Sequence, residues 1–145
     1  MLKGISPLLT ADLLHALRAM GHGDEIAIVD ANFPAASVGR RLIELPGTTS
    51  PDVLAAVLLV FPVDTFETPA AITMEVVGNA QAVPPPVADF AQVFAAAGLG
   101  TIAIGHIERG AFYARARNAY AIVRTGELRP YGNILVVKGV INATR

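Results

Sequence analysis

Residues 20–30, Met20-Gly21-His22-Gly23-Asp24-Glu25-Ile26-Ala27-Ile28-Val29-Asp30, run from the end of an amphipathic segment through a glycine-flanked turn into a short apolar stretch. Upstream of them stands Thr10, a residue type that caps helices. Apolar side chains then recur at helical spacing, at Leu13, Leu14, Leu17 and Met20. Glu25 to Val29 has the composition of a partly buried strand, and Asp30 ends it. A helix, a turn and a buried strand in this order indicate an α/β chain.

The rest of the sequence continues this alternation. We expect three more helices, over residues 51–61, 87–97 and 111–118. We expect five more strands, over residues 41–45, 72–77, 101–106, 121–124 and 134–138. No helical segment separates the last two strands, so the sheet should be mixed rather than wholly parallel. The prediction is one domain, residues 1–145, built on a mixed sheet of about six strands.

Composition narrows the function classes. Of the 145 residues, 53% are hydrophobic and only 16% are charged, which suggests that part of the surface is covered in a homo-oligomer. The net charge of −1 argues against nucleic acid as a partner, since phosphate binding needs a positive face. The chain has no cysteine, which excludes disulfides, thiolate catalysis and cysteine-ligated zinc.

The sequence also predicts a soluble, cytoplasmic protein that does not enter membranes. Residues 1–7 contain no apolar core of a signal peptide. The most apolar stretch, residues 53–63, contains Pro62 and falls short of the roughly 20 residues that span a bilayer.

His22 is the first candidate functional residue. Glycines on both sides leave space around its imidazole, so that a ligand could approach closely. The alternative is that Gly21 ends the helix and His22 is a residue of the last helical turn, favoured there by the helix dipole. Of the two other histidines, His15 fits a surface position, and the sequence leaves His106 open between a functional and a core-edge role.

A second set of candidates surrounds strand ends, where open α/β sheets bind ligands. Asp30 can accept hydrogen bonds from two adjacent sugar hydroxyls or can form an ordinary Asx turn. Arg109 can donate to hydroxyls or can be a solvated charge, and Tyr131 and Asn133 can contact a ligand or lie in an ordinary turn. The metal-site, Walker, dinucleotide-binding and nucleophile-elbow motifs are missing, so we expect neither metal nor cofactor.

From residue 1 to about residue 140, the chain resembles the RbsD/FucU family of sugar mutarotases and ribose pyranases. The segments that carry this likeness are individually unspecific, but they occur in the family's order and spacing. They are residues 2–8, 20–26, 30–35, 111–113, 121–127 and 131–135.

The resemblance implies a three-layer α/β/α subunit assembled into a ring, often a decamer. It implies a proton donor at His22 and sugar contacts at Asp30, Arg109, Tyr131 and Asn133. An arginine at position 109 is typical of the fucose branch, where ribose pyranases tend to carry histidine. Tyr120 departs from relatives with phenylalanine there and is either a second acid–base group or a packing residue.

The expected function is therefore that of an isomerase, interconverting the α and β anomers of L-fucose or a related free monosaccharide without a cofactor. Imidazole exchanges protons in either direction near neutral pH, which suits ring opening and closure. The alternatives are a D-ribose pyranase, a non-catalytic sugar-binding accessory protein of a transport system, or a structural ring protein. We further expect a site shared between subunits, with His22 and Asp30 of one facing Tyr131 and Asn133 of its neighbour.

Overall fold

A computed structural model of the chain describes residues 1–143. Five helices and six strands occur within this range, and their order alternates as the sequence indicates. The helices are α1 (Ala11–Ala19), α2 (Ala35–Val38), α3 (Ser50–Leu58), α4 (Pro85–Ala96) and α5 (Arg109–Asn118). The strands are β1 (Glu25–Val29), β2 (Leu42–Leu45), β3 (Ala71–Met74), β4 (Ile104–Ile107), β5 (Ala121–Thr125) and β6 (Ile134–Val137).

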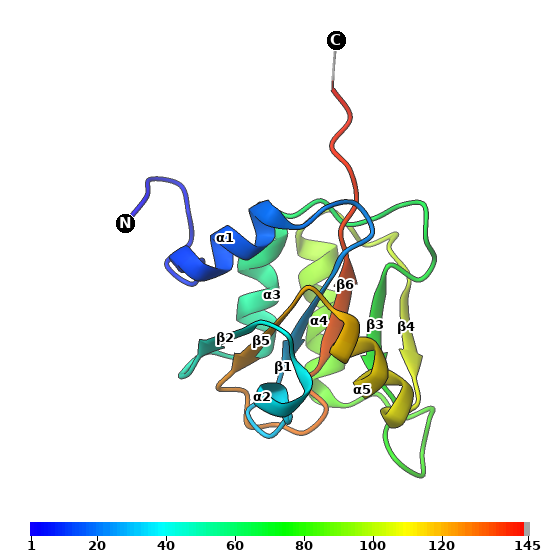
Figure 1. The fold of residues 1–145 in the computed structure, drawn as a ribbon. Helices are drawn as coiled ribbons and strands as arrows, with labels where there is room; N and C mark the ends of the chain where they lie inside the picture. The colour runs from blue at the N-terminus through cyan, green and yellow to red at the C-terminus, as the bar shows by residue number, and fades with distance from the viewer. Residues whose placement is uncertain (144–145) are drawn as a thin grey trace.

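The six strands form one mixed sheet, which confirms the prediction. Their order is β2-β5-β1-β6-β3-β4, as Figure 1 shows from one side of the sheet to the other. Strands β2, β5 and β1 run parallel, as do β3 and β4, and β6 is antiparallel to both of its neighbours. Five strands therefore point the same way and β6 is reversed between them. We call the edge where the five parallel strands end the carboxyl edge, and the opposite edge the amino edge.

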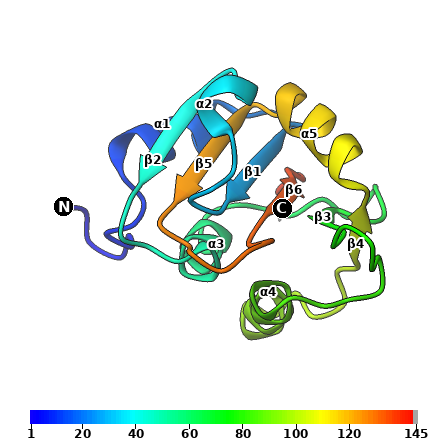
Figure 2. The same ribbon diagram turned by 90° about the horizontal axis from the view of Figure 1, so that it is seen from below.

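Helices cover both faces of the sheet, so the molecule has three layers. In Figure 2, α3 and α4 lie on one side of the sheet and α2 and α5 on the other. Side chains of α1, α3 and α4 share one buried cluster with alternate sheet residues such as Ile26 and Ile28. The second cluster joins α2 and α5 to the intervening residues Ala27 and Val29. This alternation follows from the period of two along a strand.

Helix α2 is the element that the sequence prediction missed, since it gives five helices rather than four. It has only four residues, too few for an apolar stripe to be recognised. It forms because Ala35 and Val38 are buried against the second cluster, and Gly39 ends it. A Cβ at Gly39 would lie 3.0 Å from the Ala35 carbonyl oxygen and 3.1 Å from Ile122, so the close approach favours glycine.

Two strands differ from their predicted bounds by more than one residue at an end. Strand β3 ends at Met74, not at residue 77, because the chain turns there and Val76 pairs with Asn79 in an isolated bridge. Strand β4 begins at Ile104 rather than at residue 101. The earlier end of β3 matters for function, because it places Met74 at the carboxyl edge. No helix within residues 1–143 is long and apolar enough to cross a membrane.

Candidate active site

Four of the predicted site residues meet at the carboxyl edge of the sheet. Asp30 directly follows β1, and Arg109 is the first residue of α5, close after the end of β4. Tyr131 and Asn133 precede β6, which runs in the opposite direction and therefore begins at the same edge. Together they line an open cavity of about 300 Å³, with Asn32, Phe33, Met74, Tyr113 and Pro130 as its remaining lining.

Asp30 and Asn133 form the buried floor of this cavity. The Asn133 side-chain oxygen accepts a hydrogen bond from the Asp30 backbone N–H at 2.9 Å, and the Asn133 amide donates to Asp30 Oδ2 at 3.0 Å. The other carboxylate oxygen, Oδ1, accepts from the Asn32 backbone N–H at 3.0 Å. Asp30 is 5% exposed and Asn133 is 3% exposed. Burial raises the pKa of Asp30, although the hydrogen bonds from Asn32 and Asn133 oppose it, so this carboxylate holds a proton more readily than an ordinary aspartate.

These contacts correct one expectation. We expected Asp30 to face Tyr131 and Asn133 of a neighbouring subunit, but Asp30 is hydrogen-bonded to Asn133 of its own chain. The reason is the reversed direction of β6, which pairs with β1 and brings residue 133 beside residue 30.

The rim of the cavity is aromatic and cationic. The Arg109 guanidinium carbon lies 5.4 Å from the centre of the Tyr113 ring, four residues later on the same helix face. Tyr113 in turn meets Phe33 edge to face, with ring centres 5.1 Å apart. Tyr131 has a backbone φ of 62°, rare for a residue with a side chain, and its hydroxyl accepts a hydrogen bond from the Val77 N–H at 3.1 Å.

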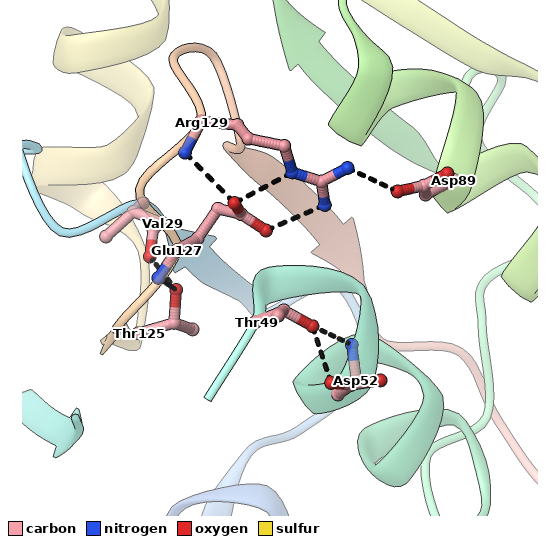
Figure 3. Close-up of polar contacts among 7 residues, drawn as sticks. All are labelled: Val29, Thr49, Asp52, Asp89, Thr125, Glu127 and Arg129. Atoms are coloured by element: carbon pink, nitrogen blue, oxygen red, sulfur yellow. Dashed lines mark hydrogen bonds and ion pairs between the residues drawn. The ribbon is translucent and has the colours of Figure 1, made fainter. Parts of the chain in front are cut away.

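The loop that carries Tyr131 and Asn133 is braced from below by an ion network (Figure 3). The Glu127 carboxylate accepts two side-chain hydrogen bonds from Arg129 at 2.9 Å, and Arg129 extends to Asp89 on α4 at 2.8 Å. Arg129 holds the pKa of Glu127 below its usual range, against the effect of burial. Thr125 continues the brace by donating to the Val29 carbonyl at 2.8 Å. The loop is therefore tied both to the end of β1 and to a helix.

Gly132 lets this loop pack closely. A Cβ at position 132 would lie 2.7 Å from the Glu127 side chain and 3.0 Å from Ser50 Oγ, so any larger residue would push the loop away. Ser50 is the first residue of α3, whose N-cap is Thr49, bonded through its hydroxyl to Asp52 (Figure 3). The position of Asn133 thus depends on the close packing of the β5–β6 loop against the start of α3.

His22 lies away from the cavity, at the amino edge. It precedes β1, whereas Asp30 follows β1, and the five residues of the strand alone span about 16 Å at roughly 3.3 Å each. The imidazole is 47% exposed, and its Nε2 lies 3.1 Å from Oδ1 of Asp64, which is only 1% exposed. The predicted proton donor and the predicted sugar contacts of one chain are therefore on opposite edges of its sheet.

Tyr120 is also at the amino edge. Its backbone N–H donates to the Glu25 carbonyl at 2.8 Å, and its ring lies under the Arg41 guanidinium, 4.1 Å from ring centre to carbon. The ring packs against the first core cluster. Of the two roles left open by the sequence, this geometry supports packing. His106 lies on β4 outside the cavity, with its Nδ1 3.1 Å from Glu75 Oε1.

Sequence reasoning missed several residues that the structure brings to the site. Tyr113 had a signal, because it stands one helical turn after Arg109. Met74 was missed because the predicted strand extended to residue 77, which placed Met74 in its interior and not at its end. Asp64 lies outside the cavity and is paired with His22. Its signal in the sequence is that it is an acidic residue directly after the apolar run that ends at Val63.

In residues 1–143, no group of three or more histidine and acidic side chains is arranged to hold a metal ion. The fold and the cavity define a small α/β protein that presents donors and acceptors beside aromatic rings at one edge of a mixed sheet. Such a lining suits a small polyhydroxylated ligand, which has both hydroxyl groups and apolar ring faces.

The chain belongs to the RbsD / FucU transport protein family, whose model matches residues 3–141. It is 44% identical to the fucose mutarotase of Homo sapiens over 147 residues, covering 97% of this chain and 94% of that protein. It is 42% identical to the fucose mutarotase of Danio rerio over 146 residues, with the same coverage. The crystal structure of the fucose mutarotase from Streptococcus pneumoniae in complex with L-fucose superposes with a TM-score of 0.91 at 38% identity, covering 97% of this chain and all of that one.

Proposed function

We propose that this protein interconverts the α and β anomers of L-fucose by acid–base catalysis, without a cofactor. The observation that carries the proposal is the carboxyl-edge cavity, where Asp30, Asn133, Tyr131 and Arg109 converge in a fold shared with an L-fucose complex. The relatives named fucose mutarotase span nearly the full chain, which supports the same activity here.

The reaction needs only proton transfers. Opening the ring removes the proton from O1, and the electron pair of that bond forms the C1=O1 carbonyl. The C1–O5 bond breaks, its electron pair stays on O5, and O5 takes up a proton. After rotation about C1–C2, the reverse steps close the ring on the other face of the carbonyl. A single imidazole that takes one proton and returns one balances the cycle, and such assistance is typically worth about 10²–10⁴-fold.

The cavity supplies the matching sugar contacts. The Asp30 carboxylate accepts hydrogen bonds from neighbouring hydroxyls, and the Arg109 guanidinium donates to others. The rings of Tyr113 and Phe33 offer an apolar wall for the hydrophobic face of the sugar and its C6 methyl group. Asn133 keeps the carboxylate in place through the two hydrogen bonds described above.

The proton donor comes from a neighbouring subunit in this proposal. His22 is a strand length away from the cavity of its own chain. Only a second copy can therefore bring the His22 imidazole to the sugar. Such a contact joins the amino edge of one subunit to the carboxyl edge of the next, which is a heterologous contact, and heterologous contacts that close produce rings. A decamer, which the family resemblance implies, is one such ring.

The proposal places the enzyme in the cytoplasm, where a chain without cysteines needs no oxidising environment.

Saturation-transfer NMR on the free sugars tests this function. Irradiating the H1 signal of one anomer of L-fucose should diminish the H1 signal of the other in the presence of the protein, at a rate above that in buffer. D-Ribose is measured alongside. Faster exchange between pyranose and furanose forms of ribose, with none in fucose, would make the protein a ribose pyranase. Saturable sugar binding without faster exchange would make it a binding protein.

A further inference from the structure

A buried carboxylate faces the imidazole of His22. Asp64 belongs to the segment before β3, 42 positions from His22, and its Oδ1 lies 3.1 Å from His22 Nε2. The two side chains differ sharply in exposure, 1% for Asp64 and 47% for His22. The carboxylate therefore sits beneath the ring, while the rest of the ring faces outward.

Asp64 is held in this position by the backbone. Its N–H donates to the Val137 carbonyl on β6 at 3.0 Å, and its Oδ2 accepts from the Glu67 N–H at 2.9 Å. Burial would raise the pKa of Asp64, but hydrogen bonds from the Glu67 and Phe66 amides, together with His22, lower it below the usual value for aspartate. The carboxylate is therefore ionised at neutral pH.

An ionised carboxylate determines which ring nitrogen carries the proton. It can only accept hydrogen bonds, so the His22 nitrogen that faces it must be protonated. In the neutral imidazole, the proton is then on Nε2, and Nδ1 is left as the bare nitrogen. Nδ1 is the ring nitrogen that is not paired with Asp64, and the side chain as a whole is 47% exposed.

Other contacts restrict the ring and its turn. The Phe66 ring, 74% exposed, lies 5.5 Å from the imidazole at a tilt of 58°. The Gly23 N–H donates to the Lys138 carbonyl at 2.8 Å. The Lys138 ammonium group donates to the carbonyls of Leu17 and Met20, each at 2.6 Å, which anchors the end of α1.

Asp24 is another charged residue near the turn. Its Oδ2 accepts a hydrogen bond from the Gly21 N–H at 2.7 Å. Among residues 1–143, the carboxylate paired with the imidazole is that of Asp64.

We propose that Asp64 is a positioning residue, which orients His22 and keeps its Nε2 protonated so that the bare Nδ1 exchanges the proton with the sugar. This inference rests on the proposed function, to which it adds a residue that acts through His22. In serine proteases, replacing the aspartate behind the histidine by asparagine favours the wrong imidazole tautomer, and the same logic applies here.

The test combines ¹⁵N NMR of the His22 ring with exchange kinetics on the full chain. The ring signals are assigned by their loss in His22→Gln and are read at a pH where titration shows the ring to be neutral. The wild-type protein should show a protonated Nε2 and a bare Nδ1. In Asp64→Asn, the pattern should become mixed or reversed.

The kinetic expectation separates positioning from binding. Asp64→Asn should lower kcat for anomer exchange about 10- to 100-fold, part of the gain that general acid–base catalysis supplies, with KM changed less than about twofold. Adding Asp64→Asn to His22→Gln should cause no further loss, because the carboxylate acts only through the imidazole. The matched control is Asp12→Asn, the same replacement at an exposed position on α1, which should retain wild-type kinetics.

Three outcomes would overturn the proposal. One is a wild-type ring with bare Nε2, a result that does not depend on Asp64→Asn and so holds even if that variant fails to fold. Another is a folded Asp64→Asn with wild-type kcat. The third is a further loss when the two substitutions are combined. Failure of the proposed function is distinct, since the wild-type protein would then not accelerate exchange at all, while its ring signals would still report on the pair.

Discussion

Asp30 and Asn133, 103 positions apart, exchange two hydrogen bonds that involve both the backbone and the side chain of Asp30. This pair connects the end of β1 to the start of β6 and places a buried carboxylate at the bottom of the cavity. The amide of Asn133 therefore contributes to both the proposed sugar site and the fold.

Asn133→Ala should weaken sugar binding and destabilise the protein together. The substitution leaves the buried Asp30 N–H without its partner, which should lower the free energy of unfolding by about 1–3 kcal/mol. Urea unfolding measures the stability and NMR titration with L-fucose measures the affinity. Asn142→Ala, at an exposed position, is the control and should change neither. If Asn133→Ala bound fucose as well as the wild type, the cavity would not be the sugar site.

Mixed oligomers test whether the site is shared between subunits. His22→Gln lacks the proposed proton donor and Asn133→Ala lacks an intact cavity, so each alone should be inactive. Random co-refolding places an intact His22 against an intact cavity in roughly a quarter of the contacts between subunits. Anomer exchange should return to about that fraction of the wild-type rate.

The controls are each variant refolded alone and a mixture of the two made without refolding. Verified mixed oligomers that regain no activity would show that His22 does not serve a neighbour's cavity.

Arg109→His should shift the preference from L-fucose toward D-ribose. Arg109 stands at the rim of the cavity over Tyr113, where its guanidinium can reach hydroxyls that a shorter imidazole cannot. The measurement is the ratio of exchange rates for the two sugars under the same conditions. Arg117→His, an exposed position on the same helix, should leave that ratio unchanged. An unaltered ratio in Arg109→His would place the discrimination elsewhere in the cavity.

Glu127→Gln should destabilise the protein at neutral pH but much less in acid. Arg129 lowers the pKa of Glu127 in the folded state, so the contribution of the carboxylate is present above the unfolded pKa of about 4.3 and is lost as pH falls through the lower folded value. Urea unfolding from pH 7 down to pH 3 should show the difference between wild type and variant shrinking below about pH 4.3.

The control for this prediction is Glu44→Gln, which breaks an exposed ion pair with Arg124 and should have little effect at any pH. A difference for Glu127→Gln that stays constant across the range would mean that the charge of Glu127 does not contribute to stability.

Much of the fold could be predicted from the sequence because the patterns that specify its helices, turns and strands are local. The helix with a cap at Thr10, the glycine-flanked turn at His22 and the strand ended by Asp30 are set by residues within a few positions of one another. The mixed character of the sheet also followed, from two final strands without a helix between them. Helix α2 was not predicted because its four residues are too few to show a repeating apolar pattern, and burial of Ala35 and Val38 stabilises it.

What only the tertiary structure decided is which of the candidate residues share a site. Strand β6 pairs antiparallel with β1, and this long-range pairing brings Tyr131 and Asn133 to Asp30 while leaving His22 at the opposite edge. The Asp64 carboxylate reaches His22 for the same reason, since its backbone is bonded to the far end of β6. The pattern of apolar and turn residues specifies where a strand begins and ends. Its neighbours and direction depend on contacts distant in the sequence, and a single sequence read along its length does not contain that information.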